Sequence, residues 1–365
     1  MRYLLGVSLR FFGLFPNEMV KAFQFVTLFL AHAAAAVPVP LIIDTDIGGG
    51  GCQDVDDVAA ISIANALADN GEAELIAVLQ NTSPKLCAGV ISVLNTWYGR
   101  EDLPIGAYRG SGLNPNDSYL PYVPLLVNNF PSPIKNTSQV PSAVDVYRKT
   151  LAAQPDGSVA ISSIGLLTNL EALLKSGPDQ FSKMTGAALV SAKVKVLAVM
   201  GGKYPSSGKS SECNFCGCYN GASAADAATA EHATAYVTSH WPPNVRLLFS
   251  GFEVGVRVQS GGRLSSCQPK SSPTRAAFES YEHGPNKSRF SWDPLTTLVA
   301  VRGVAAAHCR ECTDCNGTNR VDPSSGNNQW AAGGASNQSY IVLEDGVAAG
   351  KVLDDLLCQT PKRNW

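Results

Sequence analysis

Charged residues are scarce in this chain, and the basic ones form no cluster. Only 16% of its 365 residues are charged, and Lys+Arg 28 against Asp+Glu 30 leaves a formal net charge of -2. A protein that binds DNA or RNA needs a concentrated positive surface. The sequence therefore argues against a nucleic-acid partner and favours a small molecule. Nothing in the composition indicates disorder or a fibre.

An apolar run long enough to cross a bilayer is missing from the N-terminal region. The stretch from Ala22 to Leu30 is too short for that purpose. It follows Lys21 and precedes a run of alanines that ends before Val37, which is the order of a signal peptide. We therefore expect a leader over residues 1–36, starting at Met1 or Met19, and a secreted mature chain without a membrane partner. The alternative is a buried N-terminal helix.

Two further features favour export. Asn-X-Ser/Thr sequons occur at six positions, namely Asn81, Asn116, Asn136, Asn286, Asn316 and Asn337. The chain also has ten cysteines, an even number that fits an oxidising compartment. Together these features predict a secreted, extracellular glycoprotein with disulfide bonds.

Two cysteine clusters could form disulfides or hold zinc. They are Cys213-x-x-Cys216-x-Cys218 and Cys309-x-x-Cys312-x-x-Cys315. Neither cluster has the paired CxxC…CxxC spacing of a zinc ribbon. In a secreted chain we expect disulfides, with zinc or free thiols as the alternatives. The pairing cannot be read from the sequence.

Short apolar segments alternate with segments of helical period after the leader. The predicted strands are Leu41–Ile43, Glu74–Leu79, Val159–Ile164, Val194–Met200 and Val245–Ser250. The predicted helices are Val55–Leu67 with Asp54 as its N-cap, Leu86–Trp97, Thr168–Leu174 and Ala222–Val237. This alternation predicts an α/β fold with a doubly wound, mostly parallel sheet and helices on both faces. Ligands of such folds bind beyond the carboxyl ends of the strands.

The sequence has neither an internal repeat nor a convincing linker between domains. We therefore expect a single catalytic domain over residues 37–365. Residues 101–145 and 262–340 are richer in Pro, Gly, Ser and Asn than the rest. We expect them to form long loops or excursions around one core.

A cluster of aspartates directly follows the first predicted strand. It consists of Asp44, Asp46, Asp54, Asp56 and Asp57, and the Gly-rich segment Gly48–Gln53 separates its two halves. Carboxylates this close repel one another unless a cation or a set of donors compensates them. A hard cation that prefers oxygen ligands, calcium before magnesium, is the simplest explanation.

The competing explanations for this cluster fail at single residues. A dinucleotide-binding GxGxxG motif needs glycine where the chain has Gln53, and an EF-hand starting at Asp44 needs glutamate where it has Val55. Helix capping explains Asp54 and can extend to Asp56, but it does not explain Asp44 and Asp46, which end a strand. A metal site is therefore the favoured interpretation.

Several blocks in this order resemble the inosine-uridine-type nucleoside hydrolase family. Besides the aspartate cluster, the blocks are Gln80-Asn81-Thr82, Ser163–Leu170, Met200-Gly201-Gly202, Glu212-Cys213-Asn214 and Trp292-Asp293-Pro294. The resemblance covers roughly residues 40 to 355. It implies a calcium-dependent hydrolase that cleaves the N-glycosidic bond of ribonucleosides.

The resemblance also implies roles for single residues. Calcium would be held by Asp46, Asp57, Asp293 and the main-chain carbonyl of Ile164, together with water and the ribose 2′- and 3′-hydroxyls. The substrate contacts would be Asp56, Asn81, Met200, Glu212, Asn214 and Trp292, with Glu212 and Asn214 near the 5′-hydroxyl. Cleavage passes through an oxocarbenium-like state that carboxylates stabilise. Asp46 would be the general base that takes a proton from the water oriented by calcium.

Three positions depart from the family's pattern. Many relatives have histidine where this chain has Trp292, whereas purine-specific members resemble it in having tryptophan, which could stack on a purine; simple packing is the alternative role. The segment Gly48–Gln53 is an insert that can loop out while both of its ends stay in place, and it leaves open whether Asp54 or Asp56 faces the ribose. An asparagine of several relatives appears here as Ser206 or Ser207.

The leading hypothesis is a secreted hydrolase that releases a base and ribose from ribonucleosides, with a preference for purines. The alternatives are a hydrolase for pyrimidine nucleosides or other N-ribosides, and a non-catalytic protein that binds nucleosides or sugars. The expected partner is a small-molecule ribonucleoside, and self-association into a homo-oligomer is left open.

Overall fold

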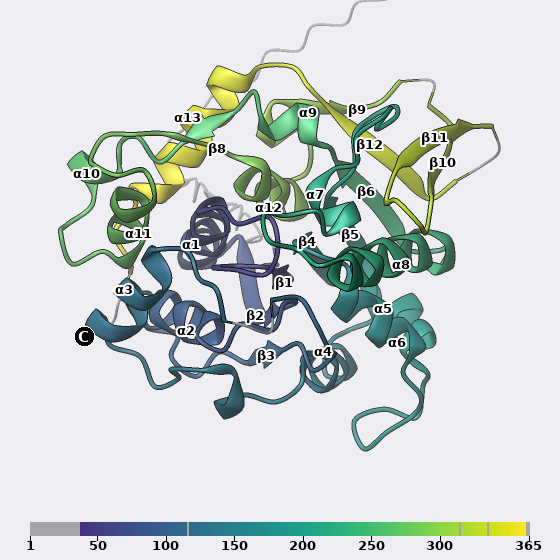
Figure 1. The fold of residues 1–365 in the computed structure, drawn as a ribbon, viewed down its shortest axis with the longest axis horizontal. Helices are drawn as coiled ribbons and strands as arrows, with labels where there is room; N and C mark the ends of the chain where they lie inside the picture. Colours follow the sequence, from purple (N-terminus) through teal and green to yellow (C-terminus); the bar gives the residue numbers. More distant parts are fainter. Residues whose placement is uncertain (1–36, 115–116, 314, 334–335, 363–365) are drawn as a thin grey trace, which may run out of the picture. The chain divides into compact units, whose positions relative to one another are not determined.

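An eight-stranded sheet forms the centre of the computed structural model, in the order β3-β2-β1-β4-β5-β6-β12-β9 (Figure 1). In sheet order the strands are β3 (Ile105–Ala107), β2 (Ala73–Gln80), β1 (Val39–Thr45), β4 (Val159–Ile164), β5 (Val194–Met200), β6 (Arg246–Ser250), β12 (Gln338–Leu343) and β9 (Cys309–Glu311). All neighbours pair in parallel except β9, which pairs antiparallel with β12. The predicted doubly wound, mostly parallel sheet is therefore confirmed.

Helices cover both faces of this sheet. On one face α1 (Asp56–Asp69) packs against α12 (Trp292–Arg302) and α13 (Gly346–Leu357), and α2 (Cys87–Trp97) packs against β2 and β3. On the other face lie α4 (Ala143–Ala152), α5 (Thr168–Lys175), α6 (Gly186–Lys193) and α8 (Ala224–His240). α8 begins at a capping box in which Ser223 and Asp226 satisfy each other's main-chain N–H groups.

Alternate residues of the central strands belong to two separate hydrophobic cores, one on each face of the sheet. Leu41 and Ile43 of β1 belong to the core under α1, α2 and α12, whereas Ile42 belongs to the core under α4, α5 and α6. Because successive side chains of a strand point to opposite faces, a strand between two helical layers must be apolar throughout. This is why β1 reads as a continuous apolar run.

The regions expected to be long loops hold several elements of their own. Residues 101–145 include β3, α3 (Tyr122–Asn129) and η1 (Thr137–Gln139), and α4 begins there. Residues 262–340 include α10 (Leu264–Cys267), α11 (Pro273–Tyr281), β8 (Arg289–Phe290), α12, η2 (Ala305–Ala307), β9, β10 (Gly317–Val321) and β11 (Asn328–Ala332), and β12 begins there. The remaining elements are α7 (Cys213–Cys216), α9 (Phe252–Gly255) and β7 (Gln259–Ser260). Of the two alternatives, long loops or excursions around one core, the second therefore describes most of these two regions.

The structure describes residues 37–114, 117–313, 315–333 and 336–362. The residues from Val37 onward form a compact unit of their own, and the expected leader at 1–36 lies outside the described residues. The single catalytic domain over 37–365 stays a prediction. No helix in the described ranges is long and apolar enough to cross a membrane.

Candidate active site

The predicted site residues gather at the carboxyl ends of the central strands. They line a cavity of about 190 Å³ beyond β1, β4 and β5. Of the residues predicted for the site, the cavity wall contains Asp46, Asp56, Asp57, Ile164, Met200, Glu212, Asn214, Trp292 and Asp293. Asn81 is not among the lining residues. The wall also includes residues that the sequence had not singled out, namely Cys52, Cys213, Phe252 and Arg289, as well as Asp54.

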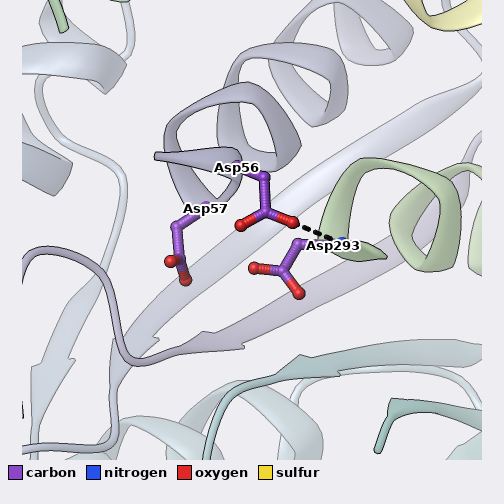
Figure 2. A group of neighbouring side chains, drawn as sticks. All are labelled: Asp56, Asp57 and Asp293. Carbon is purple, nitrogen blue, oxygen red and sulfur yellow. Dashed lines mark hydrogen bonds between the residues drawn. The ribbon is translucent and has the colours of Figure 1, made fainter. Parts of the chain in front are cut away.

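Three buried carboxylates meet at one side of the cavity. Asp56 and Asp57 begin α1, Asp293 is the second residue of α12, and each offers an oxygen within 4.8 Å of the others (Figure 2). Burial, and then the neighbouring carboxylates, raise the pKa of Asp57 and Asp293 well above the usual value. All donors here are oxygen atoms, which suits a hard divalent cation.

Asp56, rather than Asp54, is directed toward this cluster. One of its carboxylate oxygens accepts the main-chain N–H groups of Trp292 and Asp293, each at 3.1 Å. These bonds join the first turns of α1 and α12, which fixes the carboxylate in place. The structure thus brings Asp56 next to Asp57 and Asp293.

Asp54 is instead the partner of Arg289. The guanidinium Nε lies 2.8 and 2.9 Å from the two oxygens of Asp54, and a second nitrogen donates to one of them. The expected capping role of Asp54 is wrong: the N-cap of α1 is Val55, and no side chain caps it. Burial raises the pKa of Asp54, and the hydrogen bonds and charge of Arg289 oppose that rise.

Asp46 lies just beyond β1 and is only 3% exposed. The main-chain N–H of Cys52 donates to its Oδ2, and burial raises the pKa of this carboxyl to about 6 despite that hydrogen bond. Asp57 lies beside Asp46. A hydrogen bond between the two side chains opposes the rise in the pKa of Asp46. The carboxyl is therefore within reach of both the cavity and the cluster of three aspartates.

The Gly-rich insert folds inward and does not loop out. Residues 47–51 are buried, and the carbonyl oxygens of Gly48 and Gly49 accept hydrogen bonds from Leu120 N–H and the Thr82 hydroxyl. A Cβ atom at Gly51 would lie 1.7 Å from Asp46 Oδ2. Glycine is needed at position 51 because the backbone passes directly over that carboxylate.

Glu212 and Asn214 form the opposite wall. The Glu212 carboxylate accepts the main-chain N–H groups of Gly202 and Asn214, both at 2.9 Å, and burial raises its pKa to about 7. The Asn214 side chain donates to the main-chain oxygen of Met200 at 3.2 Å. The loops after β5 thus hold both side chains against the cavity.

Trp292 lines the cavity beside Phe252. Its indole N–H donates to the main-chain oxygen of Phe252 at 2.9 Å, and the two rings lie 5.5 Å apart between centroids. The side chain of Phe252 is 39% exposed. The two aromatic rings therefore form one apolar side of a cavity whose other lining residues include five aspartates, Glu212 and Arg289.

Asp44 and Asn81 are buried behind the cavity wall and do not line the cavity. The fully buried Asp44 accepts hydrogen bonds from Asn81 at 3.1 Å, Tyr147 at 2.8 Å and Asn169 at 3.0 Å. Burial nevertheless raises the pKa of Asp44 to about 7. Asn81 itself is fully buried, and its Oδ1 has no hydrogen-bond partner among the described residues.

The serines that stand in place of a family asparagine lie outside the cavity wall. The hydroxyls of Ser206 and Ser207 donate to the main-chain oxygen of Asn328 in β11. They tie the loop after β5 to the hairpin of β10 and β11. These two serines therefore support the loop and do not line the cavity.

Disulfides form in both cysteine clusters, as predicted. The pairs are Cys52–Cys213, Cys216–Cys218, Cys267–Cys358 and Cys312–Cys315, and the buried Cys87 and Cys309 are free. The first pair joins the Gly-rich insert to the residue between Glu212 and Asn214. Its position beside two site motifs was visible in the sequence, but its pairing was not.

Larger hollows occur elsewhere but lack this chemistry. One of about 990 Å³ lies at the opposite ends of the strands, near the start of β2 and β3, and one of about 940 Å³ lies beside the end of α2. Neither is lined by a cluster of buried carboxylates. The smaller cavity at the carboxyl ends of the strands is therefore the candidate active site.

The sequence matches no family model and no curated protein. Solved structures do match. A plant nucleoside hydrolase superimposes with a TM-score of 0.63 at 19% identity, over 88% of this chain and 99% of that chain. The purine-preferring ribonucleoside hydrolase from Gardnerella vaginalis superimposes with a TM-score of 0.59 at 17% identity, over 87% and 96%. The fold is that of the nucleoside hydrolases.

The nucleoside hydrolase fold also occurs in the type III effector protein XopQ, whose structure was solved with adenosine diphosphate ribose. That chain matches with a TM-score of 0.60 at 14% identity, over 88% of this chain and 93% of its own. Proteins with this fold therefore differ in what they bind, and the chemistry of this chain has to be argued from its own cavity.

Proposed function

We propose that this chain is an N-ribosyl hydrolase that releases a free base and ribose from ribonucleosides, with a preference for purines. The observation that carries the proposal is the cavity at the carboxyl ends of the strands, where three buried carboxylates face a polar wall and an aromatic wall in a nucleoside hydrolase fold. A ribonucleoside has the matching parts: a triol, a planar base, and a bond between them whose cleavage creates positive charge.

The donor set fits a hard cation, and we propose calcium. Asp57 and Asp293 are within reach of one another, and Asp46 and Ile164 line the same cavity. Buried carboxylates with raised pKa values are costly to ionise unless a positive charge is present. When bound, calcium would hold the ribose 2′- and 3′-hydroxyls and make a water molecule more acidic.

Asp46 is the residue that we assign as general base. Its carboxyl reaches the cavity beside Asp57, and burial brings its pKa to about 6, which is close to neutral pH. A base works best when its pKa is near the working pH. Asp46 would take the proton from water as the oxygen attacks the anomeric carbon.

The sugar would lie between the carboxylates and the opposite wall. Asp56 uses one oxygen for the N-terminus of α12, and its position beside Asp57 suits a ribose hydroxyl. Glu212 and Asn214 would bind the 5′-hydroxyl. The carboxylates around the cavity would stabilise the positive charge that develops on the sugar ring.

The base would stack on Trp292 and Phe252. Because the indole N–H of Trp292 is used by the Phe252 carbonyl, the base would meet its ring rather than its N–H. A bicyclic purine offers more ring area for stacking than a pyrimidine, and stacking alone does not distinguish one purine from another. This is our reason for a purine preference.

The test is a panel of purine and pyrimidine ribonucleosides, incubated with purified protein and read by the release of reducing sugar. We expect release from purine nucleosides in calcium and loss of release when a chelator is added. Asp46→Ala should abolish release while the circular dichroism spectrum stays that of the parent protein. If no nucleoside is cleaved, but nucleosides bind by calorimetry, the chain is a non-catalytic binding protein and the proposal fails.

A further inference from the structure

The disulfide Cys52–Cys213 crosses from one wall of the cavity to the other. We propose that it is a clamp that positions Asp46 on one side and Glu212 and Asn214 on the other, so that Cys52 and Cys213 are positioning residues. The inference rests on the proposed function, because it concerns the same cavity. Both cysteines are half-buried and belong to the cavity wall.

On the side of the insert, Cys52 acts through its main chain. Its N–H donates to Asp46 Oδ2, and the preceding Gly51 passes over the same carboxylate. The other insert contacts described above, at Gly48 and Gly49, hold its first half only. Besides the bond to Asp46, the half that touches Asp46 is held by the disulfide and by a 3.3 Å hydrogen bond from Tyr281 to the Gln53 carbonyl.

On the other side, Cys213 lies between the two polar residues assigned to the sugar. It is the first residue of the short helix α7, and Glu212 caps that helix by accepting the N–H groups of Asn214 and Phe215. The sulfur of Cys52 also lies 2.9 Å from Asn214 Oδ1. A displacement of Cys213 would therefore move both neighbours.

The clamp joins segments that the chain itself leaves far apart. Cys52 and Cys213 are 161 residues apart in sequence and do not lie on adjacent strands. Without the bond, a loop with glycine at four successive positions, Gly48 to Gly51, regains much of its freedom. We expect Asp46 to lose the N–H donor of Cys52, and the two walls to lose their fixed spacing.

The chain contains a matched control. Cys267–Cys358 also joins distant residues, 91 apart in sequence, but it links α10 to the end of α13 and neither cysteine lines the cavity. Substituting these two cysteines removes one disulfide and leaves the residues of the cavity wall unchanged. A general effect of losing a disulfide would appear equally in both sets of variants.

The experiment compares Cys52→Ser, Cys213→Ser and the double variant with the Cys267→Ser/Cys358→Ser double variant. For each protein we would measure kcat and KM on a purine nucleoside at a temperature well below unfolding, calcium affinity by calorimetry, and affinity for D-ribose. We expect kcat/KM and ribose affinity of the three clamp variants to fall by roughly tenfold or more. The control should change little, and calcium affinity should fall less than kcat/KM, because the clamp holds Asp46 but not Asp57 and Asp293.

The two single variants should lose as much as the double variant, because either substitution breaks the same bond. If a clamp variant does not fold, the folded parent protein is reduced with dithiothreitol, and labelled thiols are mapped by mass spectrometry. Loss of activity and of ribose affinity should then follow the appearance of free Cys52 and Cys213. Reoxidation should restore both.

Three outcomes would overturn the clamp. They are clamp variants with parental kcat/KM and ribose affinity, losses no larger than those of the control pair, and free thiols at Cys52 and Cys213 in the untreated protein. A parent protein that cleaves no nucleoside would instead contradict the proposed function. In that case ribose affinity alone decides whether the clamp positions the cavity walls.

Discussion

Asp46 and Asp54 lie in one short segment, yet they have different partners because of contacts far away in sequence. Asp46 receives its hydrogen bond from a residue only six positions away, whereas Asp54 pairs with Arg289, which is 235 positions away. The sequence could therefore place Asp46 at the site. It could not decide between Asp54 and Asp56, because the deciding partner belongs to a distant strand.

The ion pair between Asp54 and Arg289 should stabilise the fold measurably. The side chains are 10% and 28% exposed, so Arg289→Ala leaves a nearly buried carboxylate without its partner. We expect a loss of about 1–3 kcal/mol in the free energy of unfolding, measured by denaturant titration. Adding Asp54→Asn should recover part of that loss.

An exposed ion pair provides the comparison. Arg263 and Asp355 are 52% and 47% exposed. Arg263→Ala should therefore lower the free energy of unfolding by less than Arg289→Ala does. Equal losses for Arg263→Ala and Arg289→Ala would show that the Asp54 pair is no stronger than a surface contact.

Among the elements, the strands with continuous apolar runs were the easiest to predict. β4 and β5 match their predicted bounds, and β1 extends beyond Leu41–Ile43 by only two residues at each end. Strands β9 to β12 were not predicted. β9 has only three residues, and β10 and β11 form a two-stranded sheet apart from the central one, so their sequences carry little of the burial pattern that marks a central strand.

The direction taken by the insert between Asp46 and Asp54 could not be predicted for a related reason. A run of glycines shows that the chain can turn freely but not in which direction it turns. Here the direction depends on Cys87, Leu113, Val123 and Ser118, whose atoms lie where Cβ atoms on Gly48 to Gly50 would be. Only the folded structure brings these residues together.

Gly51→Ala should inactivate the site by displacing the carboxylate of Asp46. The new methyl group would overlap Asp46 Oδ2, and a displacement of the base by about 1 Å can reduce kcat/KM roughly 100-fold. The measurement is kcat/KM on a purine nucleoside. Gly177→Ala is the control, since no atom lies within 4 Å of a Cβ atom there. Near-parental activity of Gly51→Ala would mean that Asp46 is not held as described.

Across the whole molecule, the buried acids should make the stability depend on pH and calcium. Burial raises the pKa of Asp44 and of Glu212 to about 7, above the value of each in the unfolded chain. Between those values the folded state binds more protons than the unfolded state, so the free energy of unfolding falls as the pH rises. The unfolding temperature in chelator should therefore fall from pH 5 to pH 8.

Calcium should oppose this loss, because a cation favours the ionised carboxylates. At a calcium concentration about 100 times the Kd, binding would add about 2.7 kcal/mol to the free energy of unfolding. Thermal unfolding with chelator and with excess calcium, measured at each pH, tests both effects. An unfolding temperature that rises toward pH 8 in chelator would contradict the pKa shifts of Asp44 and Glu212.

The three carboxylates that meet in Figure 2 come from very different stages of synthesis. Asp56 and Asp57 leave the ribosome early, whereas Asp293 follows more than 200 residues later. A cation held by Asp57 and Asp293, as we propose, could bind only after α12 has been made and packed against α1. Until then the growing chain carries the start of α1 without Asp293, so the last third of the protein would complete the proposed cation site.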